Sequence, residues 1–198
     1  ALVSKLTDSA GLKAAVGLLA EGRHDPALAA QVRNTIEAQL SELQTSSGFD
    51  LLAVADLTGN TVAITECAGC KRLSSQATIP LQRGLAEVDH VLYQLNPLPL
   101  NIAGETAAIL VLGARFDLSR LALPGDAVLL RSGKVLASTL SRGQDQHLEQ
   151  QIAARCGTFE SACEASLGGQ TYVVSRLQKT QIGPGYRLLG FRSLDAPV

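Results

Sequence analysis

The spacing of apolar residues changes partway along the chain, and this change limits the folds available to it. From Asp25 to Ser46, apolar residues recur three or four positions apart, which is the spacing of one helix face. Asp25 suits the N-cap of this helix and Pro26 its first helical position. From Phe49 onward, short apolar runs alternate with turn-forming residues, as in β-hairpins. The sequence therefore predicts an α+β fold with a long N-terminal helical arm over residues 1–48.

The strand-forming part of the chain divides into two similar halves. In the first half, residues 49–55 and 61–65 are expected to form a hairpin, followed by a short helix over 80–87. Strands at 90–95 and 106–112, joined by a turn-rich connection, complete this half. This gives the order strand, strand, helix, strand, strand.

The second half repeats the same order, with elements expected at residues 127–131, 135–138, 144–155, 171–177 and 186–191. The residues Leu-Gly-Ala-Arg, which begin at Leu112, recur near the end of the second half as Leu-Gly-Phe-Arg, beginning at Leu189. A short match at the same place in two similar element orders indicates an internal repeat. We therefore predict two related sheet modules, over residues 49–123 and 124–198.

Composition excludes some partners. The net charge is −1, and no run of like charges occurs, so the basic surface expected of a nucleic-acid-binding protein is missing. No apolar stretch approaches the roughly 20 residues that a membrane-spanning helix needs. We therefore expect no nucleic-acid partner and no membrane span within this sequence.

The four cysteines fall in two close pairs, Cys67 with Cys70 and Cys156 with Cys163. Four cysteines allow three disulfide pairings, and sequence alone does not choose among them. Both pairs lie in segments that contain Gly or Ser, and an even number of cysteines in loops suits an oxidising compartment. Reduced thiols and a metal site are the alternatives, although the unequal spacing of the two pairs is not that of a zinc ribbon. Disulfides are predicted, with the pairing left open.

Three segments carry a resemblance to a known family. They are the strand-turn-strand from Leu51 to Ala63, its counterpart from Val128 to Thr139, and the closing segment from Tyr186 to Asp195. Together with the N-terminal helix, they make the chain resemble the extracytoplasmic sensor region of bacterial transmembrane signalling proteins, of the Cache type with PAS-like modules. This resemblance implies a double-Cache-like fold in which each sheet module is PAS-like.

The resemblance also implies a location and a mode of action. It places the chain on the periplasmic or extracellular side of the cytoplasmic membrane, between one membrane helix before Ala1 and another after Val198. A small-molecule or protein signal would be relayed through the N- and C-terminal helices to a cytoplasmic output. By its spacing alone, the apolar stripe of the helical arm would serve equally well as the seam of a homodimer or as a surface that packs against the sheets.

A sheet covered by a short helix leaves a concave space in which a small molecule can bind. In the first module, the polar residues expected to face this space are Arg83 on the short helix, Tyr93 on the third strand and Asn96 at its end. A guanidinium recognises carboxylates well. Each residue also has a structural interpretation: a solvated helix residue, a half-buried strand residue and a turn former before proline.

Two other functions compete with sensing. The spacing Cys67-Ala68-Gly69-Cys70 is that of a thiol-disulfide oxidoreductase, but this pair follows a hairpin, whereas redox pairs begin a helix that lowers the thiol pKa. A dimerisation or interaction module that senses nothing is the second alternative. Hydrolase, metalloprotease, phosphate-loop and dinucleotide motifs do not occur. We therefore predict no enzyme activity, catalytic residue, metal or cofactor.

Overall fold

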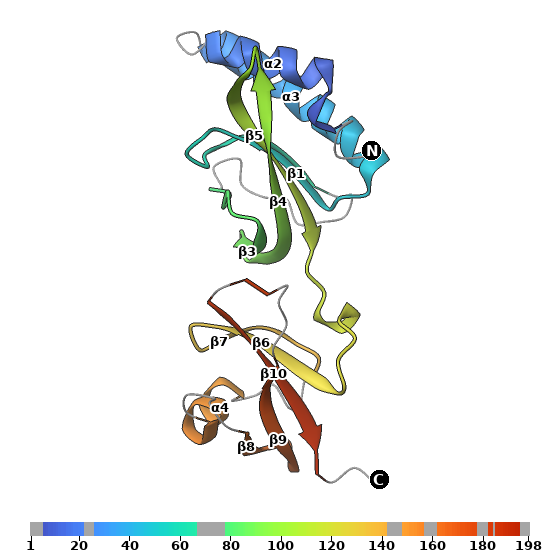
Figure 1. Ribbon diagram of the computed structural model, residues 1–198, viewed down its shortest axis with the longest axis vertical. Helices are drawn as coiled ribbons and strands as arrows, with labels where there is room; N and C mark the ends of the chain where they lie inside the picture. The colour runs from blue at the N-terminus through green and yellow to red at the C-terminus, as the bar shows by residue number, and fades with distance from the viewer. Residues whose placement is uncertain are drawn as a thin grey trace. The chain divides into compact units, whose positions relative to one another are not determined.

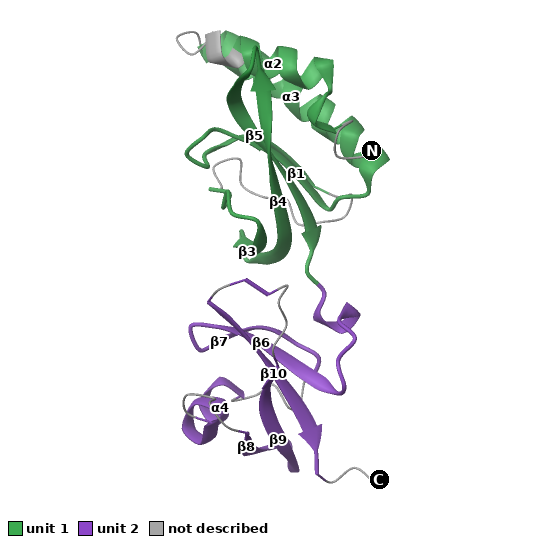
Figure 2. Cartoon of the chain, in the orientation of Figure 1, with its two compact units in different colours: residues 1–116 green, residues 117–198 purple. Residues whose placement is uncertain are grey.

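A computed structural model describes residues 6–21, 26–66, 78–141, 148–156, 162–177, 182–183 and 185–194. The chain divides into two compact units, residues 1–116 and 117–198, shown in different colours in Figure 2. Each unit contains one five-stranded antiparallel sheet. The α+β class and the pair of sheets predicted from the sequence are therefore confirmed.

The first sheet has the strand order β2-β1-β5-β4-β3. Its strands are β1 (Leu51–Ala55), β2 (Thr61–Glu66), β3 (Gly84–Val88), β4 (Val91–Ile102) and β5 (Glu105–Arg115). All five residues of β1 are buried, because this strand lies inside the sheet and both of its faces are covered. This burial explains the nearly unbroken apolar run in the sequence of β1.

The N-terminal helices, α2 (Ala10–Glu21) and α3 (Pro26–Ser47), lie side by side across one face of the first sheet (Figure 1). Pro26 is the first residue of α3, as predicted. The middle of the predicted apolar stripe of α3 is buried and packs with residues of β1 and β5, whereas Leu28 near its start is exposed. The core on this side includes Val32, Ile36, Leu40, Leu52, Val54, Leu110 and Leu112. The described part of the predicted arm thus covers the sheet, and its stripe is used within the chain.

The opposite face of the first sheet forms a second apolar cluster. Leu51 and Ala53 of β1, Val111 of β5 and Tyr93 of β4 belong to it. Ile79 covers this cluster from the connection between β2 and β3. The first sheet is therefore covered on both faces, by the helices on one face and by Ile79, in the described part of the β2–β3 connection, on the other.

The predicted helix over residues 80–87 is wrong, because residues 84–88 form strand β3. Pro80 resembles a helix start, but Gly84 has a φ of 133°, which no helix residue adopts. Asp89 and His90 then make a tight turn with positive φ at both positions, so the chain enters β4 directly. Residues 96–102 were expected to form a turn-rich connection, and this is also wrong because they continue β4.

The second unit starts with a short 3-10 helix, η1 (Leu118–Arg120), and its sheet has the order β7-β6-β10-β9-β8. The strands are β6 (Asp126–Arg131), β7 (Lys134–Ser138), β8 (Cys163–Leu167), β9 (Gln170–Leu177) and β10 (Tyr186–Ser193). Helix α4 (Leu148–Cys156) covers one face with Leu148 and Ile152. Strand β8 was not predicted, because its five residues carry little apolar character.

Both sheets have the same connectivity, so β6 to β10 correspond in order to β1 to β5. Helix α4 occupies the connection that corresponds to the segment between β2 and β3. In the parts of the chain that the structure describes, no helix combines the length and apolarity required to cross a membrane.

Candidate functional site

Tyr93 is the most unusual polar side chain of the first sheet. It lies on β4, on the face opposite the N-terminal helices, and its side chain is fully buried. Its hydroxyl makes no hydrogen bond of ordinary geometry within the described residues. Burial raises the pKa of the Tyr93 hydroxyl, so the group stays protonated and available as a donor. Leaving such a group unsatisfied costs about 1–3 kcal/mol.

Charged residues surround this hydroxyl. Arg115 of β5 lies directly opposite Tyr93 in the strand pairing, and its guanidinium partly offsets the rise in the pKa of Tyr93. The carboxylates of Glu66 and Asp50 act on the Tyr93 pKa in the other direction. One carboxylate oxygen of Asp50 also accepts a hydrogen bond from the Arg115 backbone N–H at 2.7 Å. The Tyr93 hydroxyl therefore has a guanidinium beside it and two carboxylates near enough to act on its pKa.

The structure does not bring the three predicted ligand residues together. Arg83 is exposed in a bend just before β3, whose first residue, Gly84, pairs with Leu95 of β4. Asn96 pairs with Leu112, a residue of the helix-covered face, whereas Tyr93 belongs to the other face. Of the three residues, only Tyr93 is buried and lies beside other charged groups.

Arg115, Glu66 and Asp50 were not among the predicted site residues. Arg115 closes the Leu-Gly-Ala-Arg motif, which was noticed only as an echo of the second half. Its position opposite Tyr93 depends on the register between β4 and β5, which joins residues distant in the sequence. Turn length and apolar pattern set such a register, and the misplaced β4–β5 turn concealed it.

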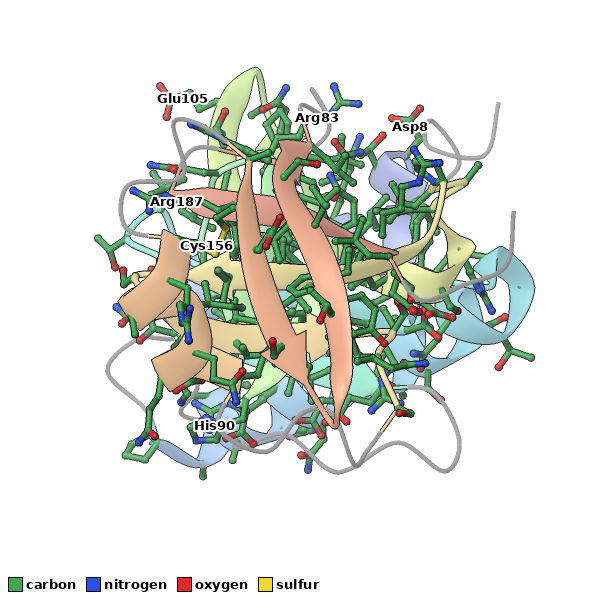
Figure 3. The ribbon with its side chains drawn as sticks, turned by 90° about the horizontal axis from the view of Figure 1, so that it is seen from below. Asp8, Arg83, His90, Glu105, Cys156 and Arg187 are labelled. Carbon is green, nitrogen blue, oxygen red and sulfur yellow. A yellow bond between two sulfur atoms is a disulfide. The ribbon has the colours of Figure 1, made fainter. Side chains whose placement is uncertain are left out.

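One predicted disulfide is present in the structure. Cys156, at the end of α4, is bonded to Cys163, at the start of β8, with an S–S distance of 2.02 Å. Cys156 is labelled in Figure 3. The bond joins the cover helix of the second sheet to its edge strand. Cys67 and Cys70, and with them the oxidoreductase alternative, lie outside the described residues.

Asp56 has a structural role in the turn between β1 and β2. Its carboxylate accepts hydrogen bonds from the Thr58 hydroxyl at 2.6 Å and from the backbone N–H groups of Thr58 and Asn60 at 2.9 Å each. These bonds, with that of the Thr58 hydroxyl the most important, lower the pKa of Asp56 to about 2. These contacts make Asp56 a turn-stabilising residue.

The described residues include no group of three or more His, Cys, Asp or Glu side chains placed to hold a metal ion.

Comparisons with known proteins agree at the level of fold. No protein-family model matches the chain, and no curated protein matches its sequence. Among solved structures, the sensor domain of the V. cholerae histidine kinase DctB superposes with a TM-score of 0.52 at 13% identity, covering 94% of this chain and 86% of that one.

Two chemoreceptor ligand-binding domains have somewhat lower TM-scores. The domain of Pseudomonas fluorescens CtaA in complex with L-serine has a TM-score of 0.47 at 16% identity, covering 93% of this chain and 87% of that one. The domain of Campylobacter jejuni Tlp3 in complex with L-norvaline has a TM-score of 0.47 at 13% identity, covering 98% and 92%. The similarity to sensor domains of bacterial signalling proteins that the sequence implied is thus confirmed as a similarity of fold.

Proposed function

We propose that this chain is the extracytoplasmic sensor domain of a membrane signal-transduction protein and that it binds a small molecule on the Tyr93 face of its first sheet. The fold shared with the DctB sensor domain supports the sensor role. The observation that carries the binding site is the buried Tyr93 hydroxyl, which makes no hydrogen bond of ordinary geometry within the described residues and has the Arg115 guanidinium beside it.

The chemistry of these groups suggests a class of ligand. The Tyr93 hydroxyl can donate to an oxygen of the ligand, and the Arg115 guanidinium can bind a carboxylate through two parallel hydrogen bonds. Glu66 and Asp50 provide negative charge nearby, which suits an ammonium group. The ligand we propose is therefore a small organic carboxylate, with amino acids as the members that also use the two acidic residues.

An extracytoplasmic location is supported by the Cys156–Cys163 disulfide, because such bonds persist mainly in oxidising compartments. Attachment to the membrane through flanking segments, and relay of the signal through the terminal helices, belong to the same proposal. Self-association through the N-terminal helices is also part of this proposal. Because Val32, Ile36 and Leu40 of α3 are buried, the contact between two copies would use other faces of the helices.

The test is a thermal-unfolding screen of the chain with small carboxylates and amino acids. A ligand that binds only the folded state stabilises it, by about 2.7 kcal/mol at a concentration 100 times its Kd. We expect at least one compound to raise the Tm of the wild type. We expect the rise to be lost in Tyr93→Phe, which removes the donor, and in Arg115→Gln, which removes the cation.

The chain provides a matched control in Tyr172, a buried tyrosine of the second sheet. Tyr172→Phe should respond to the ligand as the wild type does. If Tyr93→Phe and Arg115→Gln kept the full response, the assigned site would be wrong even though the chain binds ligand. If no compound raised the Tm of the wild type, the interaction-module alternative would replace sensing of a small molecule.

A further inference from the structure

Strand β4 extends well beyond the strand that neighbours it. Strand β3 pairs with β4 only from Val91 to Leu95, whereas β5 pairs with β4 as far as Ile102. Among the described residues, β4 from Asn96 onward therefore has a neighbour on one side only. An edge of this kind exposes backbone groups to which another strand can add.

The direction of the backbone groups along β4 follows from one hydrogen bond. The carbonyl of Leu92 accepts a hydrogen bond from the N–H of Phe116, the residue just after β5. Backbone groups alternate between the two sides of a strand, so even-numbered residues of β4 direct theirs toward β5 and odd-numbered residues toward the other side. A bulge between Leu100 and Asn101 ends this alternation.

Both odd-numbered residues between Leu95 and the bulge are prolines, Pro97 and Pro99. Proline has no N–H group, so this stretch of edge presents carbonyl acceptors and no donor. The prolines do not disturb the pairing with β5, because their nitrogen atoms lie on the side away from it. The even-numbered Leu98 and Leu100 pack into the core beneath the helices. In the repeated Pro-Leu pattern, the prolines therefore lack a donor at the free edge and the leucines contribute to the core.

We infer that Pro97 and Pro99 close the free edge of β4 to strand addition, so that neither a second copy of this chain nor an extended peptide can pair with it there. An added strand would leave two of its own carbonyls without donors, and natural sheets use edge prolines in this way. Association of this chain with itself or a partner must then use other surfaces.

The test restores the missing donors with the double substitution Pro97→Val and Pro99→Val, since valine is well suited to strands. In sedimentation velocity, we expect the double variant to form larger species as its concentration rises, beyond any association of the wild type. The new amide protons at 97 and 99 should become protected from hydrogen exchange over the same range. Pro80→Val, which lies outside the strands, should sediment as the wild type does.

The single substitution Pro99→Val is a milder variant in case the double variant does not fold, because Pro99 is exposed. It restores one donor and should produce weaker association of the same kind. The inference is overturned if a folded variant sediments like the wild type at every concentration, or if its association leaves the new amide protons unprotected.

Discussion

The two units carry a tyrosine at the same place in the same sheet. Tyr93 of β4 pairs with Ala86 of β3, and Tyr172 of β9 pairs with Ala165 of β8. Both tyrosines are buried, Tyr93 on the face that Ile79 covers and Tyr172 on the face that α4 covers. The position is therefore shared, and only the surroundings differ.

The neighbouring residues determine whether each tyrosine hydroxyl has a hydrogen-bond partner. In the second unit the Tyr172 hydroxyl donates to the side-chain oxygen of Gln170 at 2.6 Å, and the residue opposite Tyr172 on β10 is Ser193. In the first unit the residue opposite Tyr93 is Arg115, and the Tyr93 hydroxyl has no hydrogen bond of ordinary geometry among the described residues. Within the described residues, the hydroxyl at this scaffold position thus has a hydrogen-bond partner of ordinary geometry in the second unit and none in the first.

The turn before each tyrosine shows the same relation. Gly168 and Gly169 make the tight turn before β9 with positive φ at both positions, which glycine adopts without strain. Asp89 and His90 adopt the same kind of turn before β4, with φ of 47° and 66°. The first unit therefore has the same kind of turn, with an aspartate and a histidine where the second unit has two glycines.

The largest expected difference between the two units is in the stability of each sheet when a buried residue of its covering helix, α3 or α4, is truncated. Ile36 of α3 is fully buried against the first sheet, so Ile36→Ala should destabilise it by roughly 2–5 kcal/mol. We expect faster hydrogen exchange in β1 and β5 and little change in the second sheet. Ile152→Ala in α4 should have the converse effect. Equal acceleration in both sheets for either variant would mean that the units unfold as one.

The second effect concerns the disulfide, which is present in the described part of the second unit. Cys156→Ala with Cys163→Ala opens a short loop, which in the chain-entropy treatment costs about 2–3 kcal/mol. We expect the second sheet to unfold at a lower temperature while β1 and β5 keep their hydrogen-exchange protection. Adding reductant to this double variant should lower the stability of the second sheet no further. A further drop would mean that the loss has another source.

The tyrosines themselves supply the third and smaller effect, measured by urea unfolding without ligand. Tyr172→Phe removes a hydrogen bond and leaves Gln170 without it, so it should lower the free energy of unfolding by about 1 kcal/mol. Tyr93→Phe removes a buried hydroxyl that is unsatisfied within the described residues, and it should leave stability unchanged or raise it. Equal losses in the two variants would contradict the contrast between the units.

Sequence patterns predicted the parts of the fold that depend on local order. The apolar stripe of α3 and the hairpin of β1 and β2 lie close to their predicted positions. Strand β3 was missed because Pro80 resembles the start of a helix, and β8 because its residues carry little apolar character. The continuation of β4 was missed because Pro97 and Pro99 normally signal a break, and only the pairing with β5 shows that they occupy a free edge.

The repeat was recognised from the sequence but in a misleading register. The motif aligned Gly113 of β5 with Gly190 of β10. In the first sheet, Gly113 pairs with Leu95, which lies two residues after Tyr93. In the second sheet, the residue two positions after Tyr172 is Val174, and it pairs with Phe191. Gly113 therefore corresponds to Phe191, one residue later than the motif suggests. Strand pairing sets this register, and a match of four residues in the sequence does not reveal it. For the same reason, the sequence did not identify Arg115 as the neighbour of Tyr93.

The smallest effect concerns how each unit holds its first hairpin turn. The second unit uses Ser132 and Gly133 with positive φ at both, whereas the first uses the carboxylate of Asp56. Because the pKa of Asp56 in the folded chain is about 2, below its ordinary value of 3.8, its contribution is complete above about pH 4 and is lost as the pH falls toward 2. We expect this to weaken the β1–β2 hairpin at low pH.

Protection factors for amide hydrogen exchange at about pH 6 and about pH 3 would measure this loss, because they correct for the intrinsic pH dependence of exchange. Asp56→Ala should lower the stability of the first hairpin by about 1 kcal/mol near neutral pH and abolish the Asp56 part of its pH dependence. Gly133→Ala should weaken the hairpin of β6 and β7 to a similar degree at both pH values, because its cost is backbone strain at a φ of 83°. If the loss of hairpin stability depended on pH in the same way in both variants, the first turn would not depend on the Asp56 carboxylate as its contacts indicate.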